Sequence, residues 1–245
     1  MSVPGFDFSD WQDRPDTATF PDFSKAAQQA QFCLARCAYG LEADRIFPRG
    51  YDAAVKAGLI TGVFPFVDYR TWAKDNVAAL KKFLDGRDPA MVGIDLENNS
   101  KYWPTGWPTN GSSLTKWVWD YINEYHAAGL QAPLLLYTNA DTIRQMRAWP
   151  SMLAEIAAAV PLWFAWYDEG DPPASAFAPW TRVTIRQNAQ TAVGALYGME
   201  SGSLDTDTWM GSLDELKAYV AREPAPPTIE ERVAAIEQKL KDHGW

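Results

Sequence analysis

Short apolar runs recur along the chain and alternate with segments of helical periodicity. Each run has the four to eight residues of an ordinary β-strand, and the runs are 5–9, 32–38, 61–67, 90–96, 132–137, 161–166, 182–187 and 203–206. Amphipathic or cap-bounded segments lie between most of them, at 47–57, 71–84, 113–128, 140–146, 151–159 and 212–222. Strands followed by helices in this order predict an α/β protein, an irregular (β/α)8 barrel of the TIM type.

The composition changes after residue 223. Residues 224–227 read Pro-Ala-Pro-Pro, which is typical of a stiff linker. Residues 228–231 form a capping-box sequence, and apolar residues then follow at the spacings of a helix seam. We therefore expect a barrel over 1–223, a linker over 224–227 and a short amphipathic helix over 228–245. The pattern leaves open whether this helix docks on the barrel or forms a homo-oligomer through 228–243.

Composition and charge narrow the functional classes. The 245 residues fit one barrel, and a net charge of −9 argues against nucleic acid as a partner. Two histidines and two cysteines argue against a metal centre or a disulfide framework, so we expect no cofactor and no metal. Acid–base chemistry would fall to the 31 Asp and Glu residues, and the twelve Trp residues suit sugar binding.

The two cysteines, Cys33 and Cys37, fall in one predicted strand. Four residues of strand separate their Cα atoms by about 13 Å, which is too far for a disulfide, so both are predicted to be free thiols. The chain begins MSVPGFDFSDWQ, which has neither the basic start nor the apolar run of a signal peptide. No apolar stretch is long enough to span a bilayer, so we expect cytoplasmic synthesis and no membrane partner.

Two carboxylates end the strand at 90–96. Residues i and i+2 of a strand point to the same face, so Asp95 and Glu97 are predicted to lie side by side, with Cα atoms about 6.6 Å apart. Each carboxylate raises the pKa of the other, which lets one of them keep its proton near neutral pH. A glycosidase needs such a protonated carboxyl to act as the general acid on the glycosidic oxygen.

The first and last predicted strands carry further carboxylates. Asp7 lies in the strand 5–9 and Asp205 in the strand 203–206, where Asp207 shares its face. The first and last strands of a closed barrel are neighbours. Asp7 and Asp205 are therefore expected at the same mouth as Asp95 and Glu97.

These motifs, in this order, resemble glycoside hydrolase family 25, the muramidases of bacteria and their phages, including phage endolysins. The opening strand resembles the family in Gly-Phe-Asp-Phe-Ser-Asp-Trp-Gln at 5–12, and the catalytic Asp-x-Glu matches residues 93–97. Further matches lie at 32–47, 57–64, 136–139, 162–165, Gln187 and 204–211, so the resemblance covers about residues 4–220. Three residues depart from the family pattern: Asp13, Pro65 and Arg186.

The resemblance implies cleavage of the β-1,4 bond between N-acetylmuramic acid and N-acetylglucosamine in bacterial peptidoglycan, at the cell wall. It implies that Glu97 is the general acid and then the base for water, with Asp95 assisting it and orienting the acetamido group of the substrate. Asp7 and Asp205 would line the cleft and steady the developing positive charge. The residues leave open whether the reaction is substrate-assisted or uses an aspartate nucleophile.

Aromatic residues near the predicted strand ends are candidate sugar platforms. The candidate substrate-binding residues are Tyr137, Phe66, Trp166, Tyr167 and Gln187, and Trp103 and Trp107 are candidate walls of the cleft.

Two other hypotheses about the function remain. One is a non-catalytic barrel that binds glycans or takes part in virion assembly, against which the intact carboxylates argue. The other is a chitinase-like glycosidase, which would carry further acidic residues upstream of Asp95.

Overall fold

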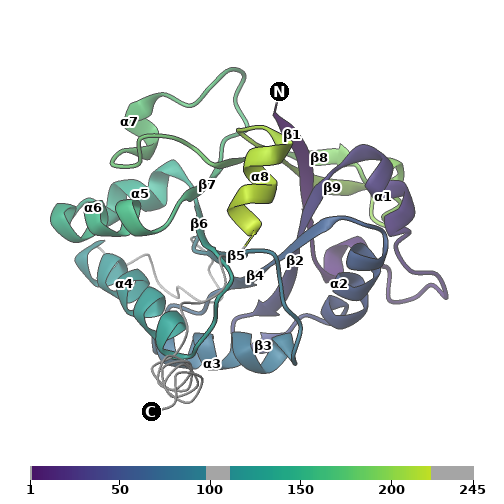
Figure 1. Ribbon diagram of the computed structural model, residues 1–245, viewed down its shortest axis with the longest axis horizontal. Helices are drawn as coiled ribbons and strands as arrows, with labels where there is room; N and C mark the ends of the chain where they lie inside the picture. Colours follow the sequence, from purple (N-terminus) through teal and green to yellow (C-terminus); the bar gives the residue numbers. More distant parts are fainter. Residues whose placement is uncertain (1, 98–110, 222–245) are drawn as a thin grey trace, which may run out of the picture.

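The computed structural model describes residues 2–97 and 111–221, and within them a closed barrel of eight strands surrounded by helices (Figure 1). The ring runs β1-β2-β4-β5-β6-β7-β8-β9 and closes where β1 pairs with both β2 and β9. The strands are β1 (Val3–Phe8), β2 (Phe32–Tyr39), β4 (Ile60–Phe66), β5 (Val92–Asp95), β6 (Leu134–Thr138), β7 (Leu162–Ala165), β8 (Ile185–Val193) and β9 (Ser203–Trp209). A two-residue strand, β3 (Glu42–Ala43), pairs with β2 outside the ring. The predicted barrel and its eight strands are thus confirmed.

The last strand runs against its neighbours, which the sequence did not predict. β9 is antiparallel to both β8 and β1, whereas the other neighbours in the ring pair in parallel. The connection from β8 to β9 spans only residues 194–202 and contains the 3-10 helix η2 (Gly194–Tyr197). A parallel return needs a crossover of a dozen or more residues, so a link this short reverses the chain. β9 therefore starts at the end of the barrel where the parallel strands finish.

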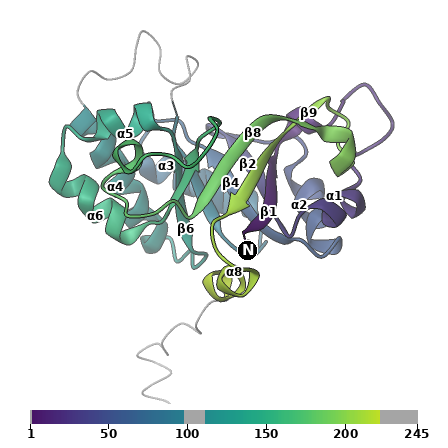
Figure 2. The ribbon, with the colours of Figure 1, turned by 90° about the horizontal axis from the view of Figure 1, so that it is seen from above.

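Helices cover the outside of the barrel and one of its ends. They are α1 (Phe23–Gln29), α2 (Phe47–Lys56), α3 (Ala73–Leu84), α4 (Gly111–Ala127), α5 (Ala140–Met146), α6 (Pro150–Ala159), α7 (Ala174–Phe177) and α8 (Leu213–Val220). Figure 2 shows α8 across the end where β1 begins. There Leu216 is buried in the barrel interior and the Tyr219 hydroxyl donates to the Leu134 carbonyl at 3.0 Å. α8 closes this end, so the opposite end is left for a site.

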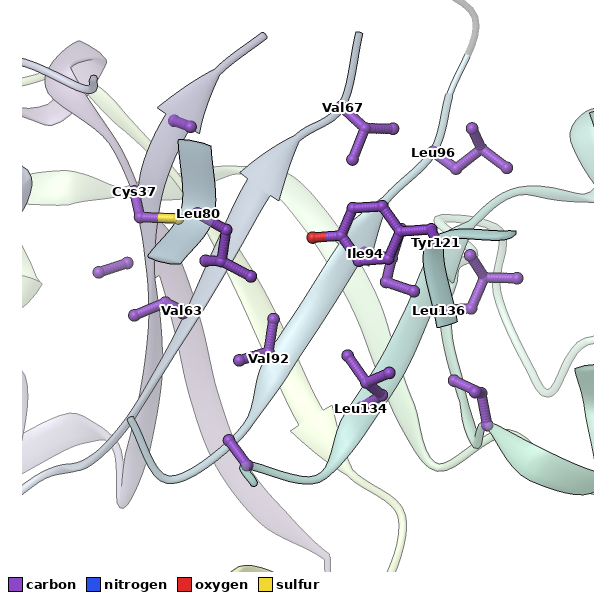
Figure 3. Close-up of a cluster of buried hydrophobic side chains, with 14 of the residues drawn as sticks. Cys37, Val63, Val67, Leu80, Val92, Ile94, Leu96, Tyr121, Leu134 and Leu136 are labelled. Carbon is purple, nitrogen blue, oxygen red and sulfur yellow. The ribbon is translucent and has the colours of Figure 1, made fainter. Parts of the chain in front are cut away.

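The main hydrophobic core lies between the barrel and its helices. Outward-facing strand residues such as Val63 and Ile94 pack there with Leu80 of α3 and Tyr121 of α4 (Figure 3). Cys37 belongs to the same cluster. Both cysteines are buried free thiols, as predicted, and burial raises the pKa of Cys33 to about 12, which keeps that thiol protonated.

The predicted linker 224–227, the helix 228–245, Trp103 and Trp107 lie outside the described residues. Among the helices of the described ranges, none combines the length and apolar character that a bilayer crossing requires.

A second, smaller cluster fills the barrel interior. The strand positions that alternate with the outer core point inward, and Trp163 of β7 is the largest of them. Its ring packs edge-on against Phe64 and Tyr137, with centroid distances of 5.6 and 4.6 Å. A Cβ on Gly93 would lie 2.9 Å from the Trp163 ring. Only glycine leaves β5 enough room for this indole.

We expect Gly93→Ala to destabilise the fold by about 1–3 kcal/mol, because overpacking forces the Trp163 ring or the strand to shift. Urea unfolding measures the change in the free energy of unfolding. Gly202→Ala is the control, because a Cβ there meets no atom within 4 Å. Equal stabilities of the two variants would contradict this account of the barrel interior.

Candidate active site

The four predicted catalytic carboxyls, Asp7, Asp95, Glu97 and Asp205, line one cavity of about 510 Å³. It opens at the end of the barrel opposite α8, where the parallel strands finish. Asp95 is the last residue of β5, and Glu97 follows it by two residues. Asp205 pairs directly with Asp7, because β9 begins at this end and runs back along β1. The antiparallel course of β9 is therefore what brings Asp205 to the mouth.

Burial and mutual repulsion hold these carboxyls in the protonated form to unusually high pH. Burial, and then the charge of Asp205, raise the pKa of Glu97 to about 7. Burial raises the pKa of Asp205 to about 6. The pKa of Asp95 lies well above its usual range, because the side chain is buried and faces Glu97. Glu97 thus still holds its proton near neutral pH, at a point where Asp205 has largely lost its own.

Asp7 lines the floor of the cavity, and Asp207 of the neighbouring strand lies one step deeper, outside the lining. Asp207 is 2% exposed and lies close enough to Asp7 for each carboxyl to change the pKa of the other. The Trp163 indole N–H donates to Asp207 Oδ1 at 2.7 Å, and Gln187 Nε2 donates to Asp7 Oδ2 at 2.7 Å. Burial raises the pKa of Asp207 to about 8, and burial with the charge of Asp207 raises the pKa of Asp7 well above its usual range. Two neighbouring carboxyls at this depth do not both ionise near neutral pH, so at least one of them keeps its proton.

Gln187 connects this floor to two tyrosines. Its amide oxygen accepts hydrogen bonds from the Tyr137 hydroxyl, at 2.8 Å, and from the Tyr167 hydroxyl. Gln190 Nε2 donates to the Tyr167 hydroxyl at 2.6 Å. The loop that carries Tyr167 is fixed in turn by Arg186, whose guanidinium donates to three backbone carbonyls between residues 166 and 170. The amide of Gln187 is thereby oriented so that its N–H group faces Asp7.

The predicted substrate-binding residues divide into three groups. Tyr137, Phe66 and Gln187 line the cavity. Tyr167 is not part of the lining and reaches it through Gln187. The structure does not place Trp166 in the cavity. Its ring stacks on Phe164 and packs against the core under the helices, because residues 162, 164 and 166 point away from the barrel interior.

Sequence reasoning missed several residues of the site. A cation, Arg36 of β2, lines the cavity at 8% exposure. Arg36 is the one charged residue in the predicted strand 32–38, and this exception was the sequence signal that could have marked it as a site residue. Trp163 also lines the cavity, and it was not predicted because a Trp in a strand is ordinarily a core residue. Other lining residues are Ser9, Trp11, Gln12, Tyr39, Phe64 and Ser203.

The described side chains do not resemble a metal centre. Within residues 2–97 and 111–221, no group of three or more His, Cys, Asp or Glu side chains is placed to hold a metal ion. Direct proton transfer by carboxyls is the chemistry that this arrangement supports.

Comparison with solved structures identifies the architecture. A muramidase from Trichobolus zukalii is 25% identical and superposes with a TM-score of 0.67, over 89% of this chain and 98% of that one. This chain has the fold of the GH25 muramidases. Two lysozymes share this fold. A family GH25 lysozyme from Aspergillus fumigatus is 24% identical, with a TM-score of 0.65 over 91% of this chain and 100% of that one. A lysozyme from Streptomyces coelicolor is 23% identical, with a TM-score of 0.66 over 90% of this chain and 97% of that one. No sequence-family model and no curated protein matches the chain.

We expect Asp207→Asn to stabilise this GH25 fold at alkaline pH. The pKa of Asp207 is about 8 in the folded protein and about 3.9 when unfolded, so folding favours the protonated form. The stability of the wild type is therefore lost as pH rises from about 4 to about 8. Asparagine keeps the oxygen that accepts from Trp163 and does not ionise.

The variant should be more stable than the wild type by up to several kcal/mol at pH 8, since each pKa unit of the shift is worth about 1.4 kcal/mol, and the gain should vanish near pH 4. Urea unfolding at both pH values measures it, with the exposed Asp16→Asn as control. A gain of the same size at pH 4 would contradict an ionisation effect.

Proposed function

We propose that this protein is a peptidoglycan hydrolase, a 1,4-β-N-acetylmuramidase. It cleaves the bond between N-acetylmuramic acid and N-acetylglucosamine in glycan strands and acts at the bacterial cell wall. The observation that carries the proposal is a single cavity in which burial raises the pKa of Glu97 to about 7 beside three other carboxyls. The muramidase and lysozymes that share the fold support the same reaction.

Glu97 is the general acid. Its carboxyl donates a proton to the glycosidic oxygen as the bond from that oxygen to the anomeric carbon breaks. The resulting carboxylate then accepts a proton from the water that completes hydrolysis. A group whose pKa lies near the working pH serves both steps, because it gives and takes a proton with little cost.

The other carboxyls act on the sugar. Asp205 has the lower pKa, about 6, and its carboxylate stabilises the positive charge that develops on the ring in the oxocarbenium-like transition state. Asp95 lies deeper, beside Glu97, and its Oδ1 has no hydrogen-bond partner among the described residues. That unsatisfied buried atom suits a contact with the acetamido N–H of the substrate. Asp7 lies on the floor, where Gln187 fixes its orientation.

Replacement of Glu97 tests the reaction. We expect Glu97→Gln to lose at least about 100-fold of the wild-type activity, the contribution of a positioned general acid. Release of reducing ends from purified peptidoglycan measures the rate, and mass spectrometry shows whether the products end in reducing N-acetylmuramic acid. Glu155→Gln, on the exposed face of α6, is the matched control and should keep full activity.

Two outcomes would contradict the proposal. Undiminished activity of Glu97→Gln would remove Glu97 from the reaction. A wild type that sediments with cell walls yet releases nothing would point to a glycan-binding or assembly protein on the same barrel.

The pH dependence tests the division of labour between Glu97 and Asp205. Activity should fall above pH of about 7 as Glu97 loses its proton, and below pH of about 6 as Asp205 gains one. The profile of kcat/KM against pH is therefore expected to be bell-shaped. Asp205→Asn should lower the maximum and remove the acidic limb. It should also move the alkaline limb to lower pH, because the charge of Asp205 no longer raises the pKa of Glu97. An acidic limb that survives in this variant would assign it to another group.

A further inference from the structure

Two tryptophans dominate the exposed apolar surface of the described residues. Trp11 is 76% exposed and Trp72 is 75% exposed. Only Trp11 lines the cavity that contains Glu97 and Asp205. Its indole N–H donates to no described residue. Aromatic rings of this size are usually largely buried, so an exposed indole beside a cavity indicates a binding surface.

The backbone that carries Trp11 is fixed from within. Trp11 is the middle residue of the 3-10 helix η1 (Asp10–Gln12), which a capping box begins. The Ser9 hydroxyl accepts from the Trp11 backbone N–H at 3.3 Å, and Gln12 Oε1 accepts from the Ser9 backbone N–H at 2.8 Å. Ser9 and Gln12 are both buried, so these bonds are shielded from water.

Ion pairs tie the same turn to the rest of the barrel. Arg36 of β2 bridges two carboxylates, with its Nε 2.8 Å from Asp44 Oδ2 and its Nη2 paired with Asp10. Asp44 also accepts from the Asp10 backbone N–H at 3.1 Å. Arg45 pairs with Asp13 directly after the helix. A turn held at both ends keeps the Trp11 side chain at the cavity without any cost of ordering at the moment of binding.

We propose that Trp11 is a stacking platform for one pyranose ring of the glycan strand, a sugar-binding position at the rim of the catalytic cavity. The inference rests on the proposed function and names a binding residue for it. The C–H face of a pyranose is apolar and matches the flat face of an indole. The indole N–H is available to a sugar hydroxyl. The Arg36 ion pairs hold the platform, so Arg36 is a positioning residue.

Binding is measured without turnover in the Glu97→Gln background. The ligand is a hexasaccharide of alternating N-acetylglucosamine and N-acetylmuramic acid, and the method is titration calorimetry. Adding Trp11→Ala should weaken binding about tenfold or more, the loss typical of a truncated aromatic anchor. Trp11→Phe keeps an aromatic ring, so its affinity for the hexasaccharide should lie between those of the parent and of Trp11→Ala. Trp72→Ala is the matched control, because it removes an equally exposed indole outside the cavity, and should bind as the parent does.

Steady-state kinetics on peptidoglycan separate binding from chemistry. With Glu97 present, Trp11→Ala should raise KM and change kcat little, because the ring contacts the sugar in the ground state and in the transition state alike. All variants should show the thermal stability of the wild type, since the replaced ring is exposed.

Unchanged hexasaccharide binding by Trp11→Ala, or an equal loss in Trp72→Ala, would overturn the platform. If either result accompanies normal cleavage by the wild type, the proposed function stands and only the role of Trp11 falls. Binding that depends on Trp11 in a protein that cleaves nothing would support the platform and overturn the hydrolysis.

Discussion

The antiparallel pairing of β9 between β8 and β1 is the constraint on which the site depends. It closes the barrel with a short connection and turns the last strand so that its first residues lie at the open end. Asp205 thereby meets Asp7 across the strand pair, and Asp207 lies one step deeper. In a parallel last strand the first residues, including Asp205, would lie at the opposite end of the barrel. The direction of β9 therefore decides whether Asp205 adds its carboxyl to the cavity.

The gathered carboxyls oppose folding, and the surrounding residues limit that cost. Burying carboxylates without partners is expensive. Asp7 and Asp207 limit this cost because their raised pKa values keep them protonated to higher pH, and because they accept hydrogen bonds from Gln187 and Trp163. Trp163 reaches Asp207 only because Gly93 leaves room for its ring. Burial, and then the charge of Asp205, raise the pKa of Glu97 to about 7. The same burial that lowers the stability of the folded protein therefore keeps Glu97 protonated near neutral pH.

The sequence predicted the barrel and the gathering of four carboxyls at one mouth, because both depend on local patterns. Apolar runs mark strands, and alternation places residues such as Asp95 and Glu97 on one face. The direction of β9 was not predictable from apolar alternation, which is the same for either direction. Trp166 was misjudged for a different reason: counting from Trp163 places it on the outward face. The role of Trp11 depends on a hydrogen-bonded turn and on ion pairs between distant segments, which no local pattern reports.

Burial and neighbouring charge keep the proton of Glu97 near neutral pH. The most direct measurement is a carbon NMR titration of protein labelled at the glutamate carboxyl carbons, with the Glu97 signal assigned by its absence in Glu97→Gln. We expect a titration midpoint near pH 7. A midpoint near 4.3, the value of an unperturbed glutamate, would contradict it.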